Sequence, residues 1–255
     1  MYKVFRVKLR NSELNAFEKV IGEFKSSIDD EISLEFFNEL QTLEESNSHE
    51  MDMIDKMDGL FPLDEYDVFI SHSHNDLKQA RQLKKYLETC LGLKVFIDSD
   101  IWANANTFLR NLDNKYCLNS DSKTYNYDKR NISTTHVHMM LAASLLKIID
   151  KSECMLLFET DSYASEKKED IMEMKSAWIY YEYLISQHIM PSIVKRKQKM
   201  LDEAIKFEDQ KNFAPFYRVS FKNIPLLDFL KLRELHNTKL VKKEYLDKLY
   251  LIAKK

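Results

Sequence analysis

Glycine, proline and cysteine are scarce in this 255-residue chain, which has only 3, 4 and 3 of them. So few glycines and prolines argue against a Gly-rich phosphate-binding loop, against long linkers and against a turn-dense all-β fold. The cysteines are odd in number and scattered, so they predict no disulfide framework and fit a reducing cytoplasm. No apolar signal segment opens the sequence, and no apolar run reaches the length of a membrane span. We therefore expect a cytoplasmic protein with no membrane partner.

Charge is plentiful but balanced. Charged residues make up 31% of the chain and the net charge is -3, so there is no global basic field for nucleic acid or anionic lipid. The basic run at 195–199 is followed closely by acidic residues and indicates a solvated helix face. We therefore expect no nucleic-acid partner. The length suffices for one α/β core with additions, or for two small domains.

An α/β pattern occupies the middle of the chain. Three apolar runs predict buried strands at 66–71, 93–97 and 154–158. Helical spacing of apolar residues fills 75–90, and a second helix is predicted from a cap at Ser133 or Thr134 to Ile149. Continuous apolar strands that alternate with helices are typical of a parallel sheet covered on both faces. Residues 99–130 are polar and poorly patterned, which predicts a long loop.

The flanks of this segment are mostly helical in pattern. Residues 2–9 alternate with period two and could form a strand, and helical spacing begins at Asn11. Beyond the middle segment we expect a charged loop at 159–175, a helix from about Met172 to His188, a fourth strand at 217–221 and two closing helices. The flanking helices could sense a trigger, set assembly or simply cover sheet edges.

Polar clusters follow each predicted strand of the middle segment, at 71–74, 98–100 and 159–162. Ligands of open parallel sheets bind outside the carboxyl ends of the strands, so these clusters mark the default site. His72 and His74 are two residues apart, but no Cys/His set has metal-ligand spacing. We therefore expect no metal site. Ser71 lacks the glycines of a nucleophile elbow and is a weak candidate nucleophile.

Ser176, Trp178 and Glu182 form the other conspicuous set. Trp178 and Glu182 are four residues apart, so they share one face of a helix, and Ser176 suits the cap of its first turn. A carboxylate beside an indole near a cleft would be partly desolvated. An ordinary amphipathic helix with Glu182 at its rim explains the same pattern.

These motifs together resemble a known family. Residues 66–73 (YDVFISHS) resemble the first signature box of Toll/interleukin-1 receptor (TIR) domains, and 94–98 (KVFID) resemble their second strand. Ser176, Trp178 and Glu182 resemble the Ser-x-Trp-x-x-x-Glu pattern on the helix that carries the catalytic glutamate of NAD-cleaving TIR domains. The glycine usual in the loop after the second strand is missing, since Ala103-Asn104-Ala105 stands in that region.

The resemblance implies a flavodoxin-like parallel sheet in a TIR domain at 64–235, with an insertion near 103–132. A mostly helical extension at 1–60 and a C-terminal helix at 236–255 are then additions. The chain is similar to bacterial stand-alone TIR proteins of antiphage defence. Such proteins assemble through TIR–TIR contacts, so a homo-oligomer is expected, with a downstream effector that senses the nucleotide product.

The activity implied by the resemblance is cleavage of the nicotinamide–ribose bond of NAD+, as a glycohydrolase or an ADP-ribosyl cyclase, with no cofactor besides this substrate. Glu182 would be the catalytic residue. The residues expected to bind the substrate are Ser71, His72, Ser73, Phe96, Asp98, Ser176 and Trp178. The main alternative is a non-catalytic TIR adaptor. A receiver-like fold fits less well, because Ser71-His72 replaces the acidic pair expected after the first strand.

Overall fold

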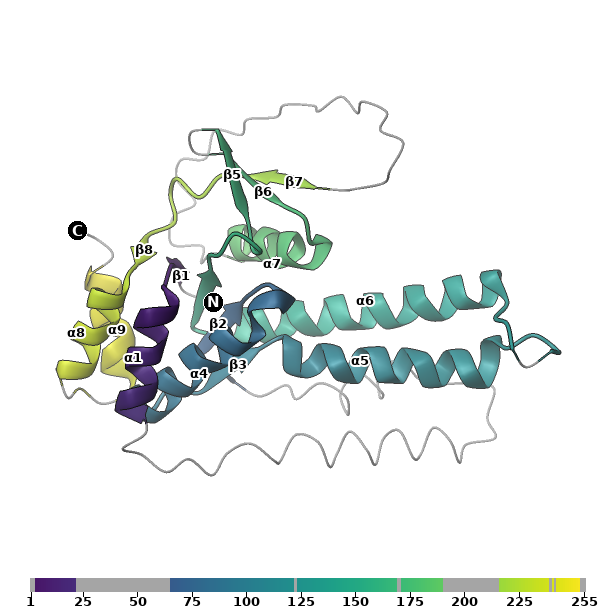
Figure 1. Cartoon of the computed structure of the whole chain (residues 1–255), viewed down its shortest axis with the longest axis horizontal. Helices are drawn as coiled ribbons and strands as arrows, with labels where there is room; N and C mark the ends of the chain where they lie inside the picture. The colour runs from purple at the N-terminus through teal and green to yellow at the C-terminus, as the bar shows by residue number, and fades with distance from the viewer. Residues whose placement is uncertain are drawn as a thin grey trace.

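A five-stranded, all-parallel sheet forms the centre of the molecule (Figure 1). The computed structural model describes residues 3–21, 65–121, 123–168, 171–189, 216–238, 240 and 242–252. The strands of the sheet are β1 (Lys3–Val7), β2 (Val68–Ser71), β3 (Val95–Ile97), β4 (Cys154–Phe158) and β8 (Leu226–Leu227). They lie in the order β3-β2-β4-β1-β8. The predicted α/β class with a parallel sheet is confirmed.

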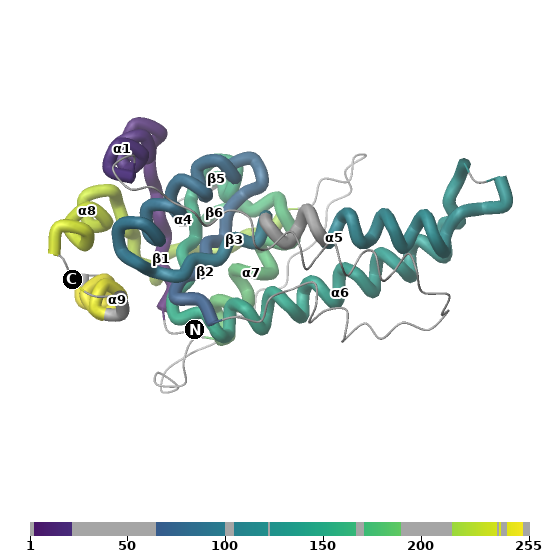
Figure 2. The backbone as a smooth tube through the Cα atoms, turned by 90° about the horizontal axis from the view of Figure 1, so that it is seen from below, coloured from purple at the N-terminus to yellow at the C-terminus, as the bar shows by residue number. Residues whose placement is uncertain are grey.

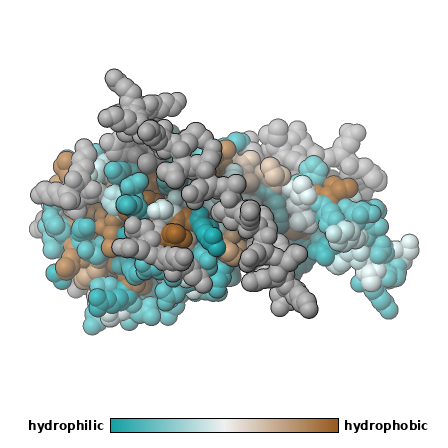
Figure 3. All heavy atoms as spheres, turned by 90° about the horizontal axis from the view of Figure 1, so that it is seen from above, coloured by the Kyte–Doolittle hydropathy of each residue, from teal (hydrophilic) through white to brown (hydrophobic). Residues whose placement is uncertain are grey.

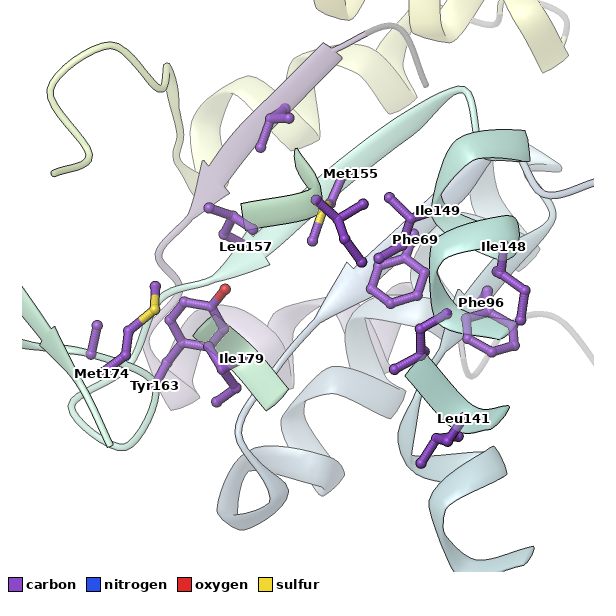
Figure 4. Close-up of a cluster of buried hydrophobic side chains, with 14 of the residues drawn as sticks. Phe69, Phe96, Leu141, Ile148, Ile149, Met155, Leu157, Tyr163, Met174 and Ile179 are labelled. Atoms are coloured by element: carbon purple, nitrogen blue, oxygen red, sulfur yellow. The ribbon is translucent and has the colours of Figure 1, made fainter. Parts of the chain in front are cut away.

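Helices cover both faces of this sheet (Figure 2). One face carries α5 (Ser99–Leu112), α6 (Tyr127–Lys151) and α7 (Ala177–His188), and the other carries α1 (Asn11–Ile21), α4 (Leu77–Leu91), α8 (Phe229–Asn237) and α9 (Lys242–Ile252). Side chains of a strand alternate between faces, so Phe69 joins the core under α5–α7 while Val68 and Ile70 join the other. Figure 4 shows part of the first core, with Phe69 and Phe96 from neighbouring strands.

The N-terminal strand β1 lies inside the sheet, between β4 and β8. Its Phe5 is opposite Leu156 of β4, and both Phe5 and Val7 are fully buried. The boundary predicted near residue 60 therefore does not separate β1 from the rest of the core. Helix α1 packs on the same core through Leu14 and Phe17. Most of the predicted extension, from residue 22 onward, lies outside the described residues.

The loop predicted at 99–130 is wrong, because α5 spans Ser99–Leu112 and continues as a π-helical segment, η2, at Asp113–Cys117. Its buried side chains Ala105, Phe108 and Leu112 have helical spacing. Asn and Asp are weak helix formers, and their abundance concealed this sparse apolar face. Packing of that face in the core outweighs the weak propensity.

Helix α6 begins at Tyr127, earlier than predicted. Its cap is Asn126, whose side chain accepts a hydrogen bond from the Lys129 backbone NH at 3.0 Å. Ser133, one of the two predicted caps, instead donates to the buried Asp113 of η2 at 2.5 Å. Helices α5 and α6 run side by side away from the sheet in both Figures 1 and 2. Within the described residues, α6 alone is long and apolar enough to span a membrane, but the core helices of soluble proteins can have the same length and composition. The inward side chains of α6 lie in the core.

A second, antiparallel sheet has its strands in the order β5 (Ser165–Lys168), β6 (Ile171–Met174) and β7 (Tyr217–Val219). In the chain, β5 and β6 come before α7 and β7 comes after it. The charged loop predicted at 159–175 is therefore wrong beyond residue 164, and α7 starts at Ala177 rather than near Met172. The strand predicted at 217–221 exists as β7, but it belongs to this second sheet. Met174 and Val219 of this sheet are buried in the core that also contains α7.

The sequence pattern predicts the two closing helices at 226–235 and 239–253. The first, α8, begins only at Phe229, because β8 occupies Leu226–Leu227, and the second, α9, spans Lys242–Ile252. A short 3-10 helix, η1 (His74–Asp76), joins β2 to α4. On the face of the molecule shown in Figure 3, apolar areas are separate and lie among polar ones.

Candidate functional site

Glu182 is a fully buried carboxyl group on the inward face of α7. The helix begins at the cap Ser176, whose Oγ accepts a hydrogen bond from the Ile179 backbone NH at 3.4 Å, as its sequence position predicts. Ile179 and Ile185 are buried on the same face and seat α7 on the core. This seating directs Glu182 toward the carboxyl end of β2.

A chain of hydroxyl groups reaches Glu182 from the sheet. Ser71, the last residue of β2, donates from Oγ to Glu182 Oε2 at 2.5 Å. The hydroxyl of Tyr163 is 3.0 Å from the same Ser71 Oγ. Burial raises the pKa of the Tyr163 phenol well above its ordinary value, so the phenol keeps its proton and can donate it to Ser71. The hydrogen-bond chain therefore runs from Tyr163 through Ser71 to Glu182.

The electrostatic setting of Glu182 is unfavourable for charge. Burial, and next the nearby Asp98 carboxyl group, raise the pKa of Glu182 well above its ordinary value, although the Ser71 hydrogen bond acts in the opposite direction. Glu182 Oε1 is buried and meets no donor among the described residues, while a side-chain hydrogen bond with Asp98 further favours the protonated form of Glu182. Removal of the proton thus costs more free energy here than at an exposed glutamate.

His72 joins the ends of β2 and β3. Its Nε2 lies 2.7 Å from Ser99 Oγ, and its Nδ1 lies 3.1 Å from Asp98 Oδ1. All three side chains are buried. They are the residue types of a serine-nucleophile triad, but the His72 and Asp98 atoms are not aligned for the hydrogen bond that a triad requires. The cluster fixes the position of Asp98 rather than creating an evident nucleophile.

The remaining predicted site residues lie around this centre. Ser73 is buried at the start of η1, and Ser176 is occupied as the α7 cap. The Phe96 ring packs in the core against Phe69, with the ring centroids 5.4 Å apart. Trp178 is half-buried and meets the His138 ring of α6 edge-on at 5.7 Å. That these side chains bind a substrate stays a prediction.

Two residues that contact the predicted site residues were not themselves predicted. Tyr163 contacts Ser71, and Ser99 contacts His72. Tyr163 stands one residue after the polar stretch 159–162, so its place near the carboxyl end of β4 was the available signal. Ser99 belongs to the polar stretch 98–100, within which the resemblance points to Asp98. Glu159 is occupied elsewhere, since its Oε1 meets Lys8 Nζ at 3.3 Å and its Oε2 meets Arg6 at 3.6 Å.

Comparison with protein-family models, with curated proteins and with solved structures gives no match. The arrangement of the side chains therefore carries the functional argument. Within the part of the chain that the structure describes, no three His, Cys, Asp or Glu side chains are grouped as metal ligands would be. The lack of a metal site stays a prediction.

Proposed function

We propose that this chain is a TIR-domain enzyme that cleaves the nicotinamide–ribose bond of NAD+, in bacterial antiphage immunity. The observation that carries the proposal is the buried Glu182 carboxyl group, which meets Ser71 at the carboxyl end of β2 and lies near Asp98 at the end of β3. These are the residues that the TIR resemblance selects, and they come from three separate parts of the chain. An amphipathic helix with Glu182 at its rim would leave that side chain exposed.

The strand order agrees with a flavodoxin-like sheet of order 2-1-3-4-5 for its first three positions. In this comparison β2 is the first strand, β3 the second and β4 the third, which accounts for the order β3-β2-β4. The fourth place is taken by the N-terminal β1 and the fifth by β8, so the chain departs from that topology there. The switch point of the fold lies between β2 and β4, where ligands bind in such sheets, and Ser71 stands at this point.

The proposed chemistry requires one carboxylate. Nicotinamide leaves NAD+ as a neutral molecule, so the reaction needs no acid to protonate the leaving group, unlike ordinary glycoside hydrolysis. Glu182 would stabilise the positive charge that develops on the ribose and would bind a ribose hydroxyl group. A cationic nicotinamide–ribose unit beside Glu182 favours the ionised carboxylate and so opposes the effect of burial on its pKa.

The product depends on what reaches the anomeric carbon. Attack by water gives ADP-ribose, and attack by a nucleophile within the same nucleotide gives a cyclic ADP-ribose isomer. Exclusion of water favours the second outcome. The resemblance also leads us to propose a homo-oligomer, assembled through TIR–TIR contacts, with a higher specific activity than the monomer.

A second candidate function is a non-catalytic TIR adaptor. The complete burial of Glu182 favours it, because a substrate must displace neighbouring groups before it can touch this carboxyl group. In that case Glu182 would serve only to join α7 to β2 through Ser71.

Incubation with NAD+ and chromatography for free nicotinamide separates the two functions. Glu182→Gln preserves the volume of the side chain and should lower nicotinamide release at least about 100-fold. Glu166→Gln, at an exposed position of β5, is the matched control and should retain wild-type release. Equal release from the wild type and Glu182→Gln would refute the catalytic assignment. No release from the wild type over a wide range of protein concentrations would favour the adaptor.

A further inference from the structure

Tyr163 is an internal tyrosine whose ring and hydroxyl group have different surroundings. The ring lies in the core beneath α7, among buried side chains that include Met174 and Ile179 (Figure 4). The hydroxyl group is 3.0 Å from Ser71 Oγ, which in turn donates to Glu182 Oε2 at 2.5 Å. A phenylalanine would fill the apolar space equally well, so packing does not account for the hydroxyl group.

We propose that Tyr163 is a positioning residue for Glu182 and acts through Ser71. Its hydroxyl group orients and polarises the Ser71 hydroxyl, which holds Glu182 Oε2 in one place. Oε1, the oxygen that Ser71 does not hold, is then the one that meets the ribose, in competition with the Asp98 side chain, which also hydrogen-bonds Glu182. The catalytic meaning of this arrangement rests on the proposed function, but the hydrogen-bond chain itself does not.

Other titratable groups also lie near Glu182 and affect its pKa, and the hydrogen bond from Ser71 acts against the rise that they cause. Asp98 approaches from the end of β3 and disfavours a second negative charge. His72 lies against Asp98, and Tyr183 of α7 lies near Tyr163. The hydrogen bond from Ser71 favours the ionised form of Glu182. Removal of the Tyr163 hydroxyl group, which orients Ser71, should therefore move the titration of Glu182 to higher pH.

The test is a double-mutant cycle read by carbon-13 NMR titration of the Glu182 carboxyl group, assigned by loss of its signal in Glu182→Gln. Tyr163→Phe should raise the titration midpoint, and Ser71→Ala should raise it further. Because Tyr163 acts through Ser71, Tyr163→Phe should add no shift in the Ser71→Ala background. The matched control is Tyr181→Phe on α7, whose hydroxyl group donates to the Ala142 carbonyl oxygen at 3.1 Å, and it should leave the midpoint unchanged.

An unchanged midpoint in Tyr163→Phe, or equal shifts in both backgrounds, would overturn the proposal. This readout requires no turnover, so it holds even where the wild type releases no nicotinamide and the proposed function fails. Where turnover is present, Tyr163→Phe should lower kcat about three- to tenfold with little change in KM, and should move the acid limb of the pH profile upward. Should Tyr163→Phe fail to fold, 3-fluorotyrosine at position 163, a stronger donor, should lower the midpoint; no movement would again overturn the proposal.

Discussion

Phe5→Ala tests whether the N-terminal strand belongs to the core of the protein. Phe5 stands in β1, between β4 and β8, and is fully buried. Opposite Leu156 in the sheet register, it also stacks on the Tyr250 ring of α9, with an interplanar angle of 3° and ring centroids 6.1 Å apart. An N-terminal extension packed loosely outside the α/β core would place no such side chain between two strands of the main sheet.

The expected loss of stability follows from these contacts. Truncation of a buried phenylalanine to alanine costs about 3–5 kcal/mol, since it removes transfer free energy and leaves a cavity. The whole free energy of unfolding of a domain is only about 5–15 kcal/mol. At about 2–4 °C for each kcal/mol in a chain of this size, the melting temperature should fall by roughly 6–20 °C.

Urea unfolding followed by circular dichroism measures this loss, with Phe216→Ala as the control. Phe216 is the same residue type, but it is 48% exposed and directly precedes β7, a strand of the small second sheet. Its truncation should cost less than about 1 kcal/mol. Equal unfolding midpoints for the two variants would refute the placement of β1 within the sheet.

Two further predictions concern Glu182 and the end of α4. The raised pKa of Glu182 means that the folded protein binds this proton more tightly than the unfolded chain does. The resulting stabilisation is complete below the unfolded pKa of about 4.3 and is lost as pH rises toward the folded pKa, by at most about 1.4 kcal/mol per pH unit. Urea unfolding at several pH values should therefore show Glu182→Gln gaining stability relative to the wild type as pH rises; parallel pH profiles would contradict this. Gly92 follows α4 at φ 65°, and a Cβ atom there would meet nothing within 4 Å, so Gly92→Ala should cost only the backbone term of about 1–2 kcal/mol. Thermal unfolding of Gly92→Ala and Gly92→Asn checks this, with the smaller loss expected for asparagine.

The sequence predicted the centre of the fold better than its connections. Strands β2, β3 and β4 are continuous apolar runs, so their patterns predict buried strands without a competing interpretation. Helix α5 was not predicted because polar residues, two of them Asn, lie between its few buried side chains, and packing in the core outweighs their weak helix propensity. Strand β1 was recognised as a strand, but a period-two pattern does not identify its neighbours. Pairing with β4 across about 150 residues of chain could be seen only in the structure.

The resemblance selected residues that the structure brings together, and their role as a site stays a prediction. Ser71 and Glu182 are 111 residues apart in the chain and form a direct hydrogen bond, which spacing alone could not indicate. The sequence does not single out Tyr163, because a tyrosine after a strand has many ordinary explanations. Residues 165–168 and 171–174 fold as β5 and β6, and neither the position of Tyr163 nor its partner could be predicted without these paired strands.

The two buried glutamates near the carboxyl edge of the main sheet have opposite electrostatic settings, and this contrast separates their roles. Glu159 follows β4 and lies within ion-pair distance of Arg6 and Lys8, so positive charge already compensates it. Glu182 has a hydroxyl donor and a neighbouring carboxyl group, and no Lys or Arg among the described residues forms an ion pair with it. A buried carboxyl group without a cation gains most when positive charge develops beside it. Of the two, Glu182 is therefore the one that would stabilise a cationic transition state most, and its environment supports the proposal independently of the motif in which it lies.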